Sequence, residues 1–502
     1  MKKILYTAAL ASVLVAGCSK SDLDLYPYNQ VATEQAFNSQ QLVQFDINGM
    51  YQGLRASGSY AVGTWNIIAD VLSDNLVLDQ VGRQSLKTYY QYTYSSNSTY
   101  GLFTGGYTVT RRANAILENI DKLPDGTFKN DARGQALALR AMLYFDMARV
   151  YSKTYLNASA SDFTLPYVTT SSATNVPPSE SLQGFYGKVI ADLVAAEPLI
   201  NPIATNTNIY LNREAVAGLL SRVYLYKGDY ANCIAEANKA LGTTPNLPNI
   251  ATFPSIWTDA TNAGVLFKVK NTSLDNINSP GVNYYQFTTR PTPTSTQNGY
   301  KSEYLPDFSF YQLYAATDVR KSAYFQTNYY NGTLYNHIIK YAGRSGPPEL
   351  GIGIPNPSVS SANPAGVVDG KLLRTAEVLL NRMEAEYRSG AIPAAVADLV
   401  LLKSNRYTGY DPTADNLLTG APLLNEILKQ RRLELAFEGD RFWDLKRLNL
   451  PVQRDATHGE AADGSGVPPN VATLPAGDNR FNLPYPQSEI NFNPGIKQNP
   501  GY

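Results

Sequence analysis

The sequence predicts a mainly α-helical protein with little β structure, in which paired helices form a scaffold that carries long, aromatic-rich loops. Two observations lead to this prediction. Apolar residues recur at spacings of three and four over several blocks, as they do on the buried face of an amphipathic helix. The stretches between these blocks lack any such period and are rich in Tyr, Thr, Asn, Pro and Gly.

The first helical blocks are residues 40–55, 111–120 and 132–151. In the third block, Leu137, Ala141 and Phe145 fall on one helical face. Each block is therefore predicted to be an amphipathic helix that packs against a neighbour.

Residues 214–248 predict two helices joined by a tight turn. Gly228 and Asp229 would make the turn, and small residues in the second helix would let it approach the first. The spacing is that of a tetratricopeptide repeat, at Leu220, Ser221, Tyr224, Gly228, Tyr230, Cys233, Ala237, Ala240 and Pro245.

A looser copy of this repeat lies at residues 372–402, where Tyr387, Gly390 and Ala395 repeat the turn. One repeat cannot bury its own apolar face, so about three or more units must stack. The predicted fold is therefore a tetratricopeptide-like helical scaffold, a short α-solenoid.

The stretches without periodicity are residues 58–106, 157–178 and 246–363. Loops of this length without structure of their own are uncommon unless they carry function. We expect ligand-binding insertions at about 58–106 and 246–363.

Composition excludes several functional classes. The 502 residues contain 42 Lys and Arg against 42 Asp and Glu, and no basic run is longer than a pair, which argues against a nucleic-acid partner. The two His residues do not form a zinc motif, and residues 366–371 are one residue short of a phosphate-binding loop. We therefore expect no catalytic centre, no metal and no cofactor, although paired carboxylates of a glycosidase would leave no motif.

The N-terminal residues predict export. Lys2 and Lys3 precede the apolar run 4–15, which is too short to span a bilayer but suits a signal peptide. The run ends in Leu-Val-Ala-Gly-Cys, similar to the lipobox of bacterial lipoproteins, so residues 1–17 are predicted to be removed and Cys18 to be lipidated. Cys233 then has no partner for an intramolecular disulfide and is expected to be a small buried side chain.

Two C-terminal motifs resemble the SusD/RagB family. Residues 431–447, RRLELAFEGDRFWDLKR, look like that family's signature helix, and residues 482–502 resemble its usual ending. By itself the first motif predicts a structural helix, with a buried face that includes Leu433, Phe437 and Trp443. Its charged residues would pair at spacings of three and four or cap neighbouring helices.

The resemblance implies that residues 18–502 form one SusD-like domain of an outer-membrane lipoprotein, exposed at the cell surface and anchored through Cys18. Such a protein captures glycans, delivers them to a SusC-like TonB-dependent transporter and is not an enzyme. Within the same fold, the alternative is a peptide-capturing component like the RagB branch. A surface glycosidase and a tetratricopeptide scaffold for a protein partner are further hypotheses.

A glycan-binding role suits the aromatic loops, because sugars stack their C–H faces on aromatic rings while amide, hydroxyl and guanidinium groups bind their hydroxyls. The residues predicted to bind ligand are Trp65, Arg83, Tyr89, Asn97, Tyr100, Phe103, Tyr284, Tyr285, Arg290 and Tyr329.

Overall fold

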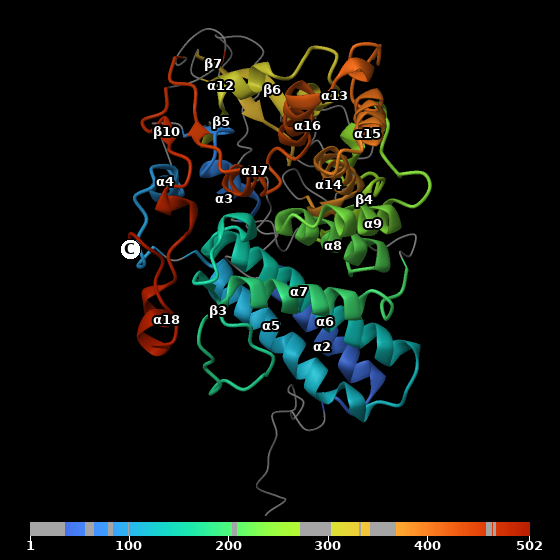
Figure 1. Ribbon diagram of the computed structural model, residues 1–502, viewed down its shortest axis with the longest axis vertical. Helices are drawn as coiled ribbons and strands as arrows, with labels where there is room; N and C mark the ends of the chain where they lie inside the picture. Colours follow the sequence, from blue (N-terminus) through green and yellow to red (C-terminus); the bar gives the residue numbers. More distant parts are fainter. Residues whose placement is uncertain are drawn as a thin grey trace, which may run out of the picture.

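The computed structural model describes residues 36–55, 65–78, 84–98, 100–202, 208–271, 303–330, 333–341, 368–457, 464 and 468–502, without the side chains of 328–330. Helices make up most of the regular secondary structure of the described residues (Figure 1). The prediction of a mainly α-helical protein is confirmed. None of the helices described is both long and apolar enough to cross a membrane.

Most of the long helices pack against the next long helix in the chain. The long helices are α2 (Gln40–Gln52), α5 (Leu102–Asn119), α6 (Thr127–Tyr151), α7 (Leu182–Ala196), α8 (Arg213–Lys227), α9 (Tyr230–Leu241), α14 (Thr375–Arg388), α15 (Ile392–Ser404) and α16 (Gly420–Glu434). Helices α5 to α9 each contact the next, and α9 packs against α14 across the long insertion (Figure 1). The helical scaffold therefore continues through segments far apart in sequence.

The predicted repeat at 214–248 forms the pair α8 and α9. Gly228 ends α8 with φ of 77°, a left-handed conformation that a residue without Cβ adopts at little cost. The carboxylate of Asp229 then caps α9 by accepting from the backbone N–H of Asn232. Gly390, with φ of 81°, makes the equivalent turn between α14 and α15.

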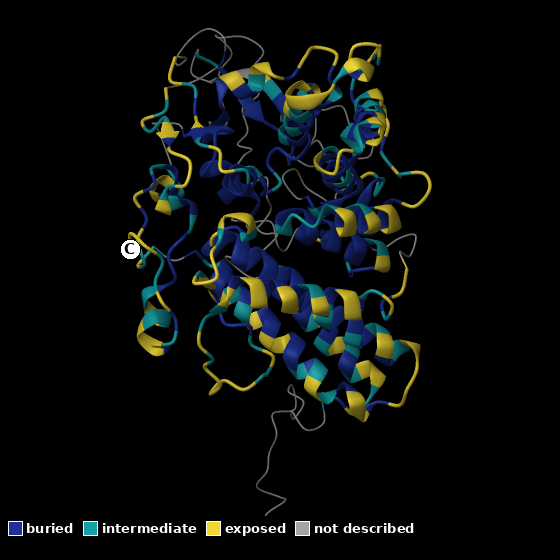
Figure 2. Cartoon of the chain, viewed as in Figure 1, coloured by how far each residue is buried: buried dark blue, intermediate teal, exposed yellow. Residues whose placement is uncertain are grey.

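Helix α6 is the centre of the lower helices, and its residues from 138 to 151 are all buried (Figure 2). The outer helices α5 and α7 expose one side. Cys233 is fully buried on α9, which confirms the expectation of a small core side chain. Buried side chains from Phe37 to Ile496 pack into one cluster.

Short helices and strands lie where the sequence predicted unstructured loops. The helices are α3 (Trp65–Val71), α4 (Lys87–Tyr90), α10 (Phe253–Ile256), α12 (Phe308–Gln312) and α13 (Val319–Tyr324). Their few residues leave too little of a period to detect. The prediction that 102–106 is loop was also wrong, because α5 begins at Leu102. Gly106 allows α5 to approach Met147 of α6, since a Cβ there would lie 2.6 Å from the Met147 sulfur.

The strands of the described residues form five antiparallel pairs of two. These are β1 (Leu76–Leu78) with β5 (Tyr304–Pro306), β2 (Phe163–Thr164) with β3 (Glu180–Ser181), β4 (Val265–Val269) with β8 (Gly370–Arg374), β6 (Phe325–Tyr330) with β7 (Thr333–Ile338), and β9 (Val452–Gln453) with β10 (Thr473–Leu474). The pair β4 and β8 joins the two ends of the long insertion, and β1 and β5 attach the insertion to the first loop region.

Residues 431–447 are not one helix. Helix α16 ends at Glu434, Phe437 and Gly439 adopt left-handed conformations with φ of 66° and 89°, and α17 (Arg441–Arg447) begins anew. The expected buried residues are buried, including Trp443 with no exposed surface.

Most charges of this motif pair across the fold and not along one helix. Glu434 is fully buried and accepts from Arg374 at 2.8 Å and from Arg406 at 2.8 and 2.9 Å. Burial alone would raise the pKa of Asp74, but the charges of Arg432 and Arg441 lower it to about 2. These contacts link α16 and α17 to segments distant in sequence, so the role of the motif is to stabilise the fold.

Candidate functional site

Several of the residues predicted to bind ligand lie outside the described residues. These are Arg83, Tyr284, Tyr285 and Arg290, together with the lipidation site Cys18. Tyr329 lies in β6, but its side chain is outside the description. Their roles stay predictions.

Three of the predicted aromatic platforms are buried in this structure. Trp65, Tyr89 and Tyr100 expose 4%, 7% and 4% of their surface. The ring of Tyr89 stacks on Tyr94 with centroids 5.3 Å apart, and Tyr94 stacks in turn on Tyr502 at 6.0 Å. Because Trp65, Tyr89 and Tyr100 are all buried, they form part of the core and do not present a flat face to a ligand.

The remaining two predicted residues differ from these. Asn97 is exposed in the turn after α4. Phe103 exposes 3% of its surface but lines a hollow of about 290 Å³. We refer to this hollow as the α5 hollow.

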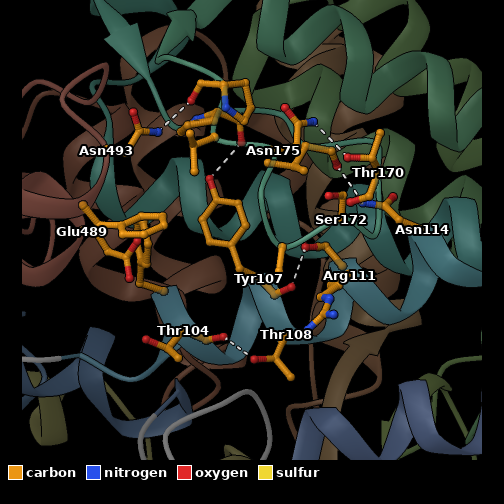
Figure 3. Close-up of a pocket in the computed structure, with 18 of the residues that line it drawn as sticks. Thr104, Tyr107, Thr108, Arg111, Asn114, Thr170, Ser172, Asn175, Glu489 and Asn493 are labelled. Carbon is orange, nitrogen blue, oxygen red and sulfur yellow. Dashed lines mark hydrogen bonds between the residues drawn. The ribbon is translucent and has the colours of Figure 1, made fainter.

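Three segments form the α5 hollow, as Figure 3 shows: helix α5, the stretch 166–177, and α18 (Gln487–Phe492) with the residues after it. Side chains three and four apart on α5 face the same side, which places Thr104, Tyr107, Thr108 and Arg111 together on its wall. The hollow thus joins segments separated by more than 300 residues.

Hydrogen bonds hold the stretch 166–177 against α5. Asn114 donates from Nδ2 to the carbonyls of Val168 and Thr170, both at 3.0 Å. The Nε of Arg111 donates to the carbonyl of Ser171 at 2.9 Å, and Tyr107 donates its hydroxyl to the carbonyl of Pro166 at 2.8 Å. The wall is therefore preorganised by groups that belong to the site itself.

Helix α18 completes the hollow. The amide of Asn493 donates to the carbonyl of Pro177 at 2.8 Å, which links this segment to the opposite wall. Phe492 exposes 66% of its surface at the edge of the hollow. Burial raises the pKa of Glu489, the single carboxylate among the residues that line it.

This arrangement suits a sugar ring better than a reaction. Phe492 offers an exposed aromatic ring, and hydroxyl, amide and guanidinium groups line the same hollow, at Thr104, Thr108, Arg111, Ser172 and Asn175. Glycosidase chemistry requires two carboxylates, one on either side of the scissile bond, and the described lining contains a single carboxylate, that of Glu489. Within the same described residues, no group of three or more His, Cys, Asp or Glu could hold a metal ion.

Sequence reasoning missed most of this site. Tyr107, Thr108 and Arg111 carry a detectable signal, since they share a face of α5 once that helix is extended to Leu102. Phe492 and Glu489 carry none, because their position depends on where the C-terminal segment packs.

Comparison with known proteins identifies the family. A model described as "SusD family" matches residues 359–502, and one described as "Starch-binding associating with outer membrane" matches residues 22–225. SusD-like protein P2 of Formosa agariphila is 24% identical, over the whole length of both chains.

Solved structures share the fold. A putative sugar binding protein from Bacteroides vulgatus is 24% identical with a TM-score of 0.77, covering 93% of this chain and 99% of that one. The surface glycan-binding protein A from Bacteroides fluxus is 20% identical with a TM-score of 0.69, covering 92% and 100%. The family models, the curated relative and these structures agree with the two C-terminal motifs, and the chain belongs to the SusD-like family, with its mainly helical, tetratricopeptide-like fold.

Proposed function

We propose that this protein is a cell-surface lipoprotein of the outer membrane that binds glycans and delivers them to a SusC-like TonB-dependent transporter. The α5 hollow supports the binding role, because an exposed aromatic ring stands beside a wall of preorganised polar groups. The family description, which combines starch binding with association to the outer membrane, supports the class of ligand and the location. The protein acts by binding and has no catalytic step.

Affinity electrophoresis tests glycan binding. The chain that starts after Cys18 is run through gels that contain plant, microbial or host polysaccharides, and retardation by one of them is the expected result. Phe492→Ala should weaken binding about fivefold to tenfold, since losing one stacked ring costs about 1 kcal/mol.

The matched control is Phe45→Ala. Phe45 is 58% exposed on α2 and does not line the hollow, so its loss should leave the retardation unchanged. Equal retardation of the Phe492 and Phe45 variants would remove the α5 hollow from the proposal. Tyr284→Ala in the same gels tests the insertion at 246–363.

Peptide capture is the alternative within this fold. Calorimetry with a peptide digest separates the two ligands: heat from peptides, with no retardation by any polysaccharide, would replace the glycan proposal.

Delivery is tested by isolating the tagged protein from outer membranes, where the transporter should be recovered with it. Cys18→Ala should release the protein from the membrane fraction.

A further inference from the structure

Glu489 is the acidic group of the α5 hollow, and its carboxylate has no partner in the fold. The residue is half-buried on α18, and none of the described residues donates a hydrogen bond to the carboxylate or forms an ion pair with it. Burial raises the pKa of this carboxyl, and no neighbouring cation offsets the effect. The hollow therefore contains a carboxylate that has lost part of its hydration without gaining a positive partner.

The polar groups close to Glu489 already have acceptors. Burial raises the pKa of the Tyr107 hydroxyl well above its usual range and the charge of Glu489 adds to that rise, so the two side chains lie near each other in the hollow (Figure 3). The Tyr107 hydroxyl donates to the carbonyl of Pro166 at 2.8 Å, and the amide of Asn493 donates to the carbonyl of Pro177 at 2.8 Å. Donors for the carboxylate must therefore come from solvent or from a ligand.

Arg111, the basic residue among those that line the hollow, does not neutralise Glu489. Its Nε donates to the carbonyl of Ser171 at 2.9 Å, and its charge is not one of the causes that shift the pKa of Glu489. The negative charge at the α18 wall is therefore available to a ligand.

The carboxylate stands beside the exposed ring of the site. Glu489 and Phe492 are three residues apart on α18, so their side chains lie on the same side of that helix. A sugar stacked on Phe492, which is 66% exposed, has its ring substituents close to Glu489. At about 30 Å³ per water in the liquid, the volume of the hollow corresponds to about nine or ten waters, which is enough for one pyranose ring.

We propose that the α5 hollow prefers amino sugars, with the pyranose ring stacked on Phe492 and a protonated amine at the carboxylate of Glu489. An ammonium group supplies both the positive charge and the N–H donors that this carboxylate lacks, and the faces of aromatic rings attract the same charge. A hydroxyl or an acetamido group at that carbon supplies a donor without the charge. The inference rests on the proposed function, because it specifies the class of sugar bound at the same site.

Ligand-observed NMR titrations with three matched disaccharides test the preference. The β-1,4-linked disaccharides of glucosamine, N-acetylglucosamine and glucose share one linkage and differ at carbon 2. At about pH 6.5, where the amine is protonated, the glucosamine disaccharide should bind about threefold to tenfold more tightly than the other two. Raising the salt concentration from about 0.02 M to about 0.3 M should reduce this preference, since it screens the charges.

Variants of the two α18 residues separate charge from stacking. Glu489→Gln removes the charge of a half-buried side chain that has no partner, so the variant should fold, and it should lose most of the preference for the glucosamine disaccharide. Phe492→Ala should weaken the binding of all three disaccharides and keep the preference. The control is Asp411→Asn, which changes the net charge equally at an exposed residue outside the lining and should leave all three affinities unchanged.

Several results would overturn the inference. Equal binding of the three disaccharides, no binding of any of them, or an equal loss of all three in Glu489→Gln would contradict a preference for the amine. Ethanolamine that binds as tightly as the glucosamine disaccharide would show that the hollow recognises any amine and not a sugar. None of these results removes glycan binding itself, which the retardation in polysaccharide gels decides separately.

Discussion

Replacing Glu434 by Gln removes the negative charge that neutralises several guanidinium groups in the core. Glu434 has no exposed surface and contacts Arg374 at 2.8 Å, Arg406 at 2.8 Å and Arg320 at 3.4 Å. The amide of Gln keeps the shape but carries no charge, so buried cations lose their counterion. Breaking a buried ion pair by removing one partner costs about 3–5 kcal/mol, and we expect a loss of that size in the free energy of unfolding.

Urea unfolding at pH 7, followed by circular dichroism, measures this loss. The matched control is Lys429→Gln on the same helix. Lys429 is 40% exposed and pairs with Glu426 at 3.2 Å, so its loss should cost less than about 1 kcal/mol. If Glu434→Gln proves no more costly than Lys429→Gln, the burial of the ion cluster does not stabilise this fold and the reasoning is refuted.

The pH dependence gives an independent check. Burial alone would raise the pKa of Glu434, but the charges of Arg406 and Arg374 hold it well below 4.5. A carboxylate whose pKa is lowered on folding stabilises the protein above its unfolded pKa and ceases to do so as the pH falls through its folded pKa. The difference in stability between wild type and Glu434→Gln should therefore be complete at neutral pH and shrink below about pH 4.5.

Two further predictions concern the scaffold. Gly228→Ala should lower the free energy of unfolding by about 1–2 kcal/mol, because φ of 77° disfavours a residue with a Cβ. The control is Gly187→Ala on helix α7, where an added Cβ would have no atom within 4 Å, and this change should be neutral or stabilising. Burial lowers the pKa of Lys340 from 10.5 to about 8. Between pH 8 and pH 10.5 the unfolded chain therefore binds more protons than the folded protein, and the stability that Lys340 contributes rises with pH. Lys340→Met should lack that rise, and parallel pH profiles for wild type and variant would contradict the assignment.

The helical scaffold could be predicted because its causes are local. Helix periodicity, the left-handed glycine at Gly228 and the cap at Asp229 depend on residues within a few positions of one another. The helix pairs of the two repeats lie where these signals placed them. The early start of α5 was missed because Gly105 and Gly106 resemble a loop, whereas the lack of a side chain at Gly106 allows the contact with α6.

The residues of the candidate site could not be predicted in the same way. An aromatic ring in a polar stretch is equally suited to the core and to a ligand platform, and only contacts across the chain decide which role it takes. Tyr89 became core because Tyr94 and Tyr502 cover that region. Phe492 stayed exposed beside α5 because Asn493 and the carbonyl of Pro177 hold the C-terminal segment there.

The sequence by itself determined the class of fold, the repeat turns and the family motifs, since each is written in short-range spacing. The tertiary structure decided which charges meet and which rings are exposed. Glu434 lies 60 residues from Arg374, and α18 lies more than 300 residues from the stretch that it faces across the α5 hollow. Which side chains become partners depends on how the whole chain packs, and a short-range sequence pattern does not contain that information.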